Sequence, residues 1–296
     1  MEVLKFYTLL LINYLYIERK GGYIMSKELQ KSKIIELYTI ENKSINQIAK
    51  ELSISWGTVK KYLIEEDIEI ISNRNQYSCN NNNINENLFK EINDYDSAYW
   101  LGFLYADGNI RDGNRNEISL ELKEEDFDTI KDFHDYCGNK NSIRKHIIKK
   151  NNKEYYSYTS SFSSKKVKEN LINLGCVPKK SLILKCPSNT QVPKEYFYDF
   201  LRGYIDGDGY IQYDFDKYRY RIVICGTKEM LQGIITRCEW FEYCSITKDN
   251  KSSIYTLTIS NKENVYNILS KLYENSKYHL KRKFDIFQAA KTKLGI

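Results

Sequence analysis

The spacing of apolar residues changes repeatedly between a helical period and strict alternation from residue 93 onwards. Residues 117–123 alternate without a break, which predicts a strand with one buried and one polar face. The acidic triplet that follows, Glu124 to Asp126, predicts the start of a helix running to Cys137, because the helix dipole favours acids in the first turn. Residues 142–148 and 155–162 predict a second hairpin. The order over residues 93–186 is therefore helix, two strands, helix, two strands, helix.

The same order of elements recurs over residues 187–296. Expected strands cover residues 210–215, 219–225, 245–249 and 254–259, and expected helices cover residues 227–240 and 261–275. In the second strand Tyr220, Ile222 and Ile224 are expected to point inward, and Arg219 and Arg221 outward. The pattern predicts an α+β fold with two pseudo-symmetric αββαββα units. Each unit has a four-stranded antiparallel sheet covered by helices on one face only.

The N-terminal part of the chain, residues 31–66, has the pattern of a helix-turn-helix. Ser44 and Gln47 form a capping box for its second helix, and Ser55 is placed to cap a third helix, Trp56 to Leu63. Modules of this kind insert their last helix into the major groove of DNA. The residues expected to contact DNA there are Trp56, Thr58, Lys60 and Lys61. A purely structural three-helix unit is the alternative.

Two further segments complete the domain organisation. An apolar run within residues 1–24 is too short to span a membrane and lacks a small-residue cleavage site. Met25 opens a more ordinary N-terminus, so we expect translation to start there or residues 1–24 to be a loose extension. Residues 73–92 include four consecutive asparagines and predict a flexible linker. The expected domains are residues 1–24, 25–72, 73–92, 93–186 and 187–296.

A nine-residue phrase that ends in Asp-Gly occurs twice, at residues 100–108 and 201–209. The helix-start signals before the two copies are Asp96-Ser97 and Pro193. Two small residues lie four apart in each copy, Gly102 with Ala106 and Gly203 with Gly207. They share one helix face, so two such helices can approach closely.

Parallel packing of these two helices would bring Asp107 and Asp208 together at the C-terminal ends. Helix C-termini carry partial negative charge, so the two carboxylates would repel each other without a cation between them. This arrangement predicts a site for magnesium, which binds oxygen ligands. An EF-hand loop from Asp206 onwards is excluded, because Ile211 and Lys217 stand where glycine and glutamate are required.

Composition narrows the class of partner and the compartment. The net charge of +6 suits a polyanionic partner. The seven cysteines show no C-x-x-C spacing, which indicates reduced thiols in a cytosolic protein. The 26 tyrosines accompany abundant Asn, Lys and Ile, a combination typical of AT-rich coding, so they do not by themselves indicate base stacking.

The duplicated phrase resembles the motif of the LAGLIDADG homing endonucleases. The second copy keeps the residues Leu201, Gly203, Ile205, Asp206, Asp208 and Gly209. The first keeps Gly102, Ala106, Asp107 and Gly108, with Tyr105 in place of the acid at the sixth letter. One copy alone would be an ordinary helix ending. Two copies separated by the length of a domain indicate the family far more specifically.

The resemblance implies a metal-dependent endonuclease that makes double-strand breaks in DNA at a long, pseudo-palindromic target. The family's metal-binding acid is the eighth letter, which is Asp107 in the first copy and Asp208 in the second. The carbonyls of Ala106 and Gly207 would complete the coordination of Mg²⁺, for which Mn²⁺ can substitute. A lysine assists near each active site in the family, and the matching segments offer Lys180 and Lys283, with Lys281 as a substitute.

The two sheets would form a saddle whose polar face reads base edges in the major groove. The residues expected to contact DNA there are Asn109, Arg111, Arg144, His146, Gln212, Arg219, Arg221, Thr256 and Thr258. We expect a cytoplasmic monomer, nucleoid-associated in a bacterium or phage, with no membrane contact and no obligate protein partner. Its gene would be free-standing or carried by a mobile intron. A non-cleaving DNA-binding regulator, or an RNA-splicing maturase on the same scaffold, is the alternative.

Overall fold

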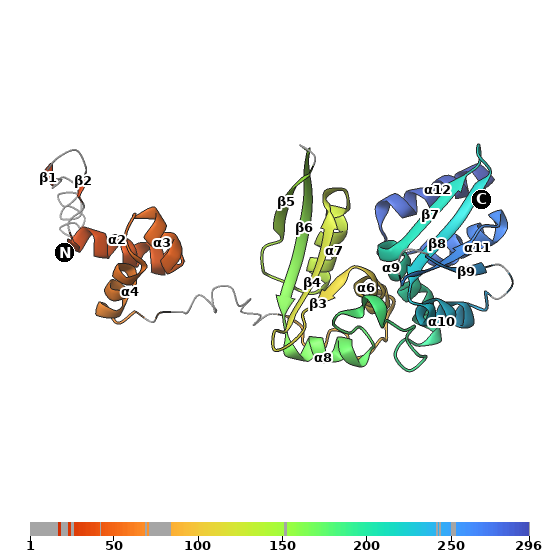
Figure 1. Ribbon diagram of the computed structural model, residues 1–296, viewed down its shortest axis with the longest axis horizontal. Coiled ribbons are helices and arrows are strands. Elements are labelled where there is room, and N and C mark those ends of the chain that lie inside the picture. The colour runs from red at the N-terminus through yellow and green to blue at the C-terminus, as the bar shows by residue number, and fades with distance from the viewer. Residues whose placement is uncertain are drawn as a thin grey trace. The chain divides into compact units, whose positions relative to one another are not determined.

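The computed structural model describes residues 17–18, 23–24, 27–41, 43–68, 70, 84–150, 153–240, 242, 244–249 and 253–295. The chain divides into two compact units, residues 1–80 and 81–296 (Figure 1). Most of the expected extension, including its apolar run, and the asparagine run lie outside the described residues. A short antiparallel pair, β1 (Ile17–Glu18) and β2 (Tyr23–Ile24), is described. Among the described residues, no helix is long and apolar enough to cross a membrane.

The described part of the N-terminal unit contains three helices, α2 (Lys27–Thr39), α3 (Ile45–Glu51) and α4 (Trp56–Glu65). The Ser44 hydroxyl accepts the N–H of Gln47 and the Gln47 side chain accepts the N–H of Ser44, which confirms the capping box. Ser55 caps α4 by accepting the N–H of Thr58. The buried side chains of Ile34, Ile48 and Val59 close a small core between the helices.

The first αββαββα unit follows the predicted order. It contains α6 (Tyr95–Ala106), β3 (Gly108–Ile110), β4 (Glu117–Lys123), α7 (Phe127–Tyr136), β5 (Arg144–Lys150), β6 (Lys153–Ser163) and α8 (Lys165–Asn173). Its antiparallel sheet has the order β3-β4-β6-β5. The cap of α6 is Asp94, which accepts the N–H of Ser97, and not the expected Asp96. The acidic triplet forms a 3-10 turn that leads into α7.

The second unit repeats this order and adds one helix. It contains α9 (Phe197–Asp208), β7 (Gly209–Asp214), β8 (Arg219–Gly226), α10 (Lys228–Cys238), β9 (Cys244–Lys248), β10 (Tyr255–Ile259), α11 (Lys262–Tyr273) and α12 (Lys281–Leu294). Its sheet order, β7-β8-β10-β9, matches that of the first sheet. Ile222 and Ile224 are buried, and Arg219 and Arg221 are exposed, as the alternation predicts. The basic segment that begins at Lys281 is the first turn of α12, a helix that the sequence pattern did not predict.

One hydrophobic core joins the two αββαββα units. Helices α6 and α9 lie between the two sheets (Figure 1), and their apolar side chains belong to the same buried cluster as residues of both sheets. The α+β architecture with two four-stranded antiparallel sheets is therefore confirmed. The two sheets are held in one body because the paired helices are buried on every side. In α6, all residues from Ser97 to Tyr105 are buried.

The expected linker is shorter than the sequence suggests. Ile84, Leu88, Phe89 and Ile92 are buried in the core of the C-terminal body. The side-chain amide of Asn170 donates hydrogen bonds to the carbonyls of residues 86 and 88, at 3.2 Å and 3.0 Å. Placing the end of the linker at residue 92 was therefore wrong. The apolar residues at 84, 88 and 92 indicate packing, whereas the run of consecutive asparagines stops at residue 83.

Candidate active site

The duplicated helices meet backbone against backbone. A Cβ added to Gly102 would lie 1.9 Å from the carbonyl oxygen of Phe200, and one added to Gly203 would lie 2.0 Å from that of Tyr99. Further along, a Cβ on Gly207 would lie 2.3 Å from the Cβ of Ala106. The contacts advance in the same direction along both helices, so α6 and α9 are parallel and their C-terminal ends lie together.

Asp107 and Asp208 stand at these two adjacent helix ends. Asp107 is the C-cap of α6, and Asp208 is the last residue of α9. The Oδ2 atom of Asp107 lies 3.2 Å from the position that a Cβ on Gly207 would occupy, which places it beside the residue preceding Asp208. Both aspartates reach the surface. Within the described residues, neither carboxylate has a hydrogen bond or an ion pair.

The surroundings of the two carboxylates disfavour their negative charge. Neighbouring protein atoms restrict their hydration and raise the pKa of both groups. The pKa of Asp208 rises to about 6, because the charge of Asp107 adds to the effect of desolvation. Lys180 and Lys283 act in the opposite direction on both groups. A cavity of about 180 Å³ beside Asp208 is lined in part by Lys180 and Cys225.

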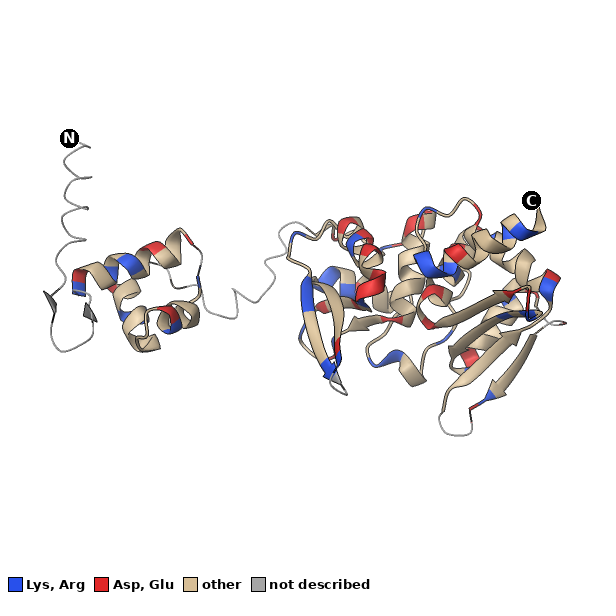
Figure 2. Ribbon diagram, turned by 90° about the horizontal axis from the view of Figure 1, so that it is seen from above, with Lys and Arg blue, Asp and Glu red and all other residues tan. Residues whose placement is uncertain are grey.

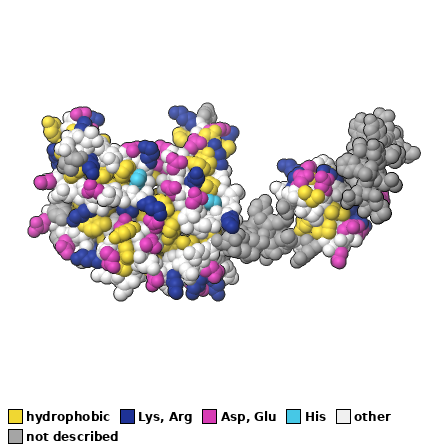
Figure 3. Space-filling view, turned by 180° about the vertical axis from the view of Figure 1, so that it is seen from behind, with side chains coloured by type: hydrophobic (Ala, Val, Ile, Leu, Met, Phe, Trp, Pro, Cys, Tyr) yellow, Lys and Arg dark blue, Asp and Glu magenta, His cyan; other side chains and the backbone are white. Residues whose placement is uncertain are grey.

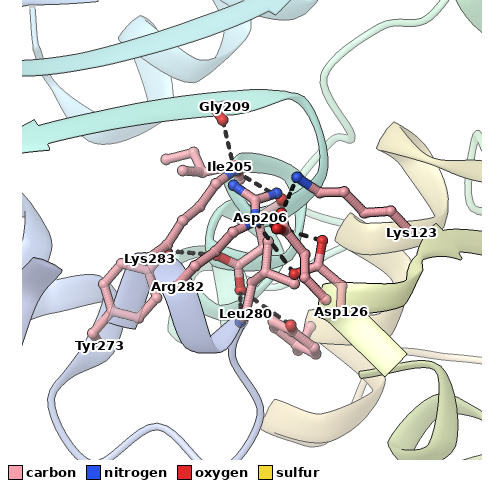
Figure 4. Close-up of polar contacts among 11 residues, drawn as sticks. Lys123, Asp126, Ile205, Asp206, Gly209, Tyr273, Leu280, Arg282 and Lys283 are labelled. Atoms are coloured by element: carbon pink, nitrogen blue, oxygen red, sulfur yellow. Dashed lines mark hydrogen bonds and ion pairs between the residues drawn. The ribbon is translucent and has the colours of Figure 1, made fainter. Parts of the chain in front are cut away.

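Each of the two candidate lysines binds carbonyls at the end of one motif helix. Lys180 begins a 3-10 turn, and its Nζ donates to the carbonyl of Gly108. Lys283 is buried in the first turn of α12, and its Nζ donates to the carbonyls of Ile205, Asp206 and Gly209, at 2.5 Å, 2.8 Å and 2.6 Å (Figure 4). Burial lowers the pKa of Lys283 to about 8.

The remaining lysine of this segment has a different partner. Lys281 forms an ion pair at 2.8 Å with Asp285, one turn further along α12. Its ammonium group is therefore held on the surface of α12 itself. Lys283 is the residue of this segment that reaches the end of α9.

The sixth letter of the motif has a structural role that sequence reasoning missed. Asp206 is buried and accepts hydrogen bonds from the Tyr99 hydroxyl at 3.1 Å, the Tyr273 hydroxyl at 2.6 Å and the Leu280 N–H at 2.7 Å. Burial raises the pKa of this carboxyl. At the equivalent position in the first copy, the Tyr105 hydroxyl donates to the carbonyl of Leu174 at 2.6 Å. The two halves therefore fix their motif helices with different polar groups.

A cross-unit ion pair lies next to this network. The Nε of Arg282 is 3.3 Å from Asp126, a buried acid in the 3-10 turn after β4 (Figure 4). The charge of Arg282 also favours ionisation of Asp107. Sequence reasoning treated the acidic triplet only as a helix-start signal. The pairing joins residues 156 positions apart, and no local pattern reveals it.

The oxygen donors at the helix ends fit a hard divalent cation. Among the described residues, no group of three or more His, Cys, Asp or Glu side chains is placed to hold a metal. Magnesium is typically held by one or two carboxylates together with water and substrate phosphates. Asp107 and Asp208 supply such a pair. Ala106 and Gly207 precede them in the last helical turns, where carbonyls lack intrahelical partners.

The residues expected to contact DNA share one face of each sheet, the face opposite the helices. In the first sheet Asn109, Arg111, Arg144 and His146 are exposed. In the second, Gln212 pairs with Arg221, and Thr256 and Thr258 occupy the same face as Arg219 and Arg221. Basic residues follow the β5–β6 hairpin (Figure 2). The surface is hollowed between the β5–β6 and β7–β8 tips (Figure 3).

The corresponding residues of the N-terminal unit lie on α4. Trp56 is 46% exposed, and the Lys60 ammonium lies 5.0 Å from the centre of its ring. Lys61 is exposed and 3.8 Å from Glu65. Thr58 shares a hydrogen bond with the Ser55 hydroxyl at 2.8 Å. Trp56 lies in the first turn of α4, and much of its side chain is in solvent.

The C-terminal body is a duplicated α+β structure. Its two αββαββα units are joined by parallel helices, and an aspartate stands at the end of each helix. A family model described as "LAGLIDADG-like domain" matches residues 198–273. Residues 198–273 are thus similar to a LAGLIDADG-like domain, which confirms the resemblance inferred from the motif. The matched segment runs from α9 to α11 in the second unit.

Several solved structures are similar to the chain. The homing endonuclease I-WcaI bound to its DNA recognition sequence has 15% identity, with 72% of this chain and 92% of that chain covered and a TM-score of 0.46. The LAGLIDADG meganuclease I-AabMI bound to uncleaved DNA has 10% identity, 69% and 92% coverage, and a TM-score of 0.43. Full-length DUF199/WhiA from Thermatoga maritima has 18% identity, 71% and 66% coverage, and a TM-score of 0.41.

No curated protein matches the chain.

Proposed function

We propose that this protein is a divalent-metal-dependent DNA endonuclease of the homing type. It would act as a monomer on double-stranded DNA and cut both strands at a long, pseudo-palindromic target. The observation that carries the proposal is the meeting of Asp107 and Asp208 at the ends of two parallel helices. The LAGLIDADG-like domain in the second unit supports the same reading, as do the basic and polar residues along both sheets.

In this proposal Asp107 and Asp208 hold Mg²⁺, with Mn²⁺ as a substitute, and the carbonyls of Ala106 and Gly207 add oxygen ligands. The ion supplies activation of water and neutralisation of charge at the scissile phosphate. The raised pKa of Asp208 reflects first its desolvation and second the neighbouring charge of Asp107, and a bound cation would offset both effects.

The two lysines have different parts in this proposal. The ammonium of Lys180 lies at the end of the first motif helix, and its single described hydrogen bond is to a carbonyl. It therefore retains donors for a phosphate oxygen. Lys283 gives its three donors to the end of α9 and holds that helix end in place. Its positive charge also favours ionisation of both aspartates.

The test is a selection of cut duplexes from a library that combines random DNA with the locus around the gene, in the presence of Mg²⁺. The wild-type chain is expected to leave paired cuts at one recurring sequence. Asp107→Asn or Asp208→Asn should keep DNA affinity and lose double-strand cleavage. Asp135→Asn, on the outer helix α7, is the matched control and should cut normally.

Three results would contradict the proposal. Continued double-strand cutting by both aspartate variants would refute the metal assignment. Tight, sequence-specific binding without any cleavage by the wild-type chain would favour the alternative of a DNA-binding regulator, which the N-terminal helix-turn-helix unit also suits. Preference for RNA over duplex DNA would favour a maturase.

A further inference from the structure

A row of polar side chains crosses the first sheet on the face opposite the helices. Arg111 follows β3, Glu117 lies on β4, Ser161 on β6 and Arg144 on β5. Arg111 contacts the Glu117 carboxylate at 3.2 Å. Arg144 lies 3.7 Å from the same carboxylate and donates to the Ser161 hydroxyl at 2.8 Å. Because the sheet order is β3-β4-β6-β5, the row spans the whole sheet.

The stability contributed by these ion pairs does not explain why Glu117 is present on this face of the sheet. The side chains of Arg111, Arg144 and Glu117 are 48%, 54% and 30% exposed, and ion pairs this exposed contribute little to stability. A carboxylate on a surface that faces DNA also weakens the attraction to phosphates. Glu117 does, however, restrict the rotamers of two guanidinium groups at once.

The second sheet carries a different set at the equivalent positions. Glu117 precedes Ile118, which pairs with Ile110 of β3, and Arg221 precedes Ile222, which pairs with Ile211 of β7. Glu117 and Arg221 therefore occupy the same place in the two sheets and have opposite charge. Gln212, which pairs with Arg221, stands where the first sheet has Arg111.

We infer that Glu117 is a positioning residue that holds Arg111 and Arg144 ready to read guanine in the half-site under the first unit. The inference rests on the proposed function. A guanidinium has five N–H donors, so one that contacts a carboxylate keeps others for the O6 and N7 acceptors of guanine. Fixing the side chains before binding reduces the entropy lost on contact. Among the residues that the structure describes, no carboxylate contacts Arg221 or Gln212, so the second half-site, which these two residues meet, is read independently.

The test is selection of bound duplexes from a randomised library, with the full chain in EDTA so that cleavage does not intervene. The wild type is expected to enrich guanine at one or two positions of one half-site. Glu117→Gln keeps the side-chain shape and removes the charge. It should lower that guanine preference about tenfold, leave the other half-site unchanged, and keep or increase affinity for random DNA.

Two further variants keep the result interpretable. Arg144→Lys retains the positive charge but loses the planar guanidinium that can donate two parallel hydrogen bonds. It should weaken guanine preference in the same half-site, and it tests the inference even if Glu117→Gln fails to fold. Glu154→Gln is the matched control, because its carboxylate on β6 is paired with a lysine at 3.1 Å and not with an arginine. Its base preferences should equal those of the wild type.

The possible failures are distinguishable. A wild type that enriches no sequence overturns the proposed function, and the inference falls with it. A wild type that enriches a target while Glu117→Gln and Arg144→Lys keep the same base preferences overturns the inference alone. Equal relaxation of both half-sites by Glu117→Gln would also overturn it, because the role assigned to Glu117 is confined to the first sheet.

Discussion

The carboxylate of Asp206 accepts the backbone N–H of Leu280 at 2.7 Å, across 74 positions of sequence. Leu280 is the N-cap of α12, the helix that carries Lys283. Without a capping side chain of its own at that position, α12 relies on the motif helix for this hydrogen bond. The end of α9 and the start of α12 are therefore fixed to each other by one buried acid.

Removing the carboxylate of Asp206 should destabilise the C-terminal body more than removing the hydroxyl of Tyr105, its counterpart in the first motif. Asp206→Ala leaves two tyrosine hydroxyls and one N–H without their acceptor, and should lower the free energy of unfolding by about 3–5 kcal/mol. Tyr105→Phe loses one hydrogen bond and should cost about 1 kcal/mol. Urea unfolding of both variants measures the difference, and equal losses would contradict it.

Adding one methyl group at the helix interface should be more damaging than its size suggests. A Cβ at Gly203 would lie 2.0 Å from the carbonyl oxygen of Tyr99 and 2.7 Å from the N of Phe103, so Gly203→Ala forces the helices apart. We expect a loss of about 3 kcal/mol or more in unfolding free energy. Gly57→Ala is the control: its Cβ would meet only Ser55, at 3.7 Å, and alanine favours helix by about 1 kcal/mol.

Neutralising Asp208 should stabilise the metal-free protein, in a pH-dependent way. Its pKa is 3.8 ordinarily and about 6 in the folded protein, so the unfolded chain loses the proton first as pH rises. Stability therefore falls between these two values, and the full penalty is present above pH 6. In EDTA, Asp208→Asn should melt above the wild type at pH 7.5, with the gap closing towards pH 4. A gap of constant size would contradict this origin.

The contribution of the N-terminal unit to DNA binding should be modest and specific to α4. Between Lys27 and Asp67 the chain has seven lysines and seven acids, so the module has no net charge to attract DNA. If α4 enters the groove, Lys60→Gln should lower the salt slope of binding by about 1. Lys33→Gln, on α2 and paired with Glu36, should leave the slope unchanged. Salt titrations of the full chain measure both.

Local signals in the sequence were sufficient for most elements of the fold. Strand β4 covers the alternating residues 117–123, and Ser44 and Ser55 cap the helices they were expected to cap. These features depend on neighbours within a few positions. The close approach of the motif helices could also be predicted, because small residues four apart mark one helix face whatever the partner is.

Features that depend on distant residues were missed. The three hydrogen-bond donors to Asp206 come from α6, α11 and the start of α12. The position of Asp206 within the motif therefore gave no indication of these donors. The row through Glu117 draws its members from four strands. The end of the linker at residue 84 and the helical form of residues 281–294 also depend on packing against the body.

The contact of Gly102 and Gly203 with main-chain atoms has a consequence for how such a molecule can change. Every sequence has the same peptide groups, so each half offers the other a surface that substitutions elsewhere do not reshape. The outer strands of the two halves are free to diverge while the junction stays constant. A single polypeptide can in this way acquire two unlike recognition surfaces without any change in the interface between its two central helices.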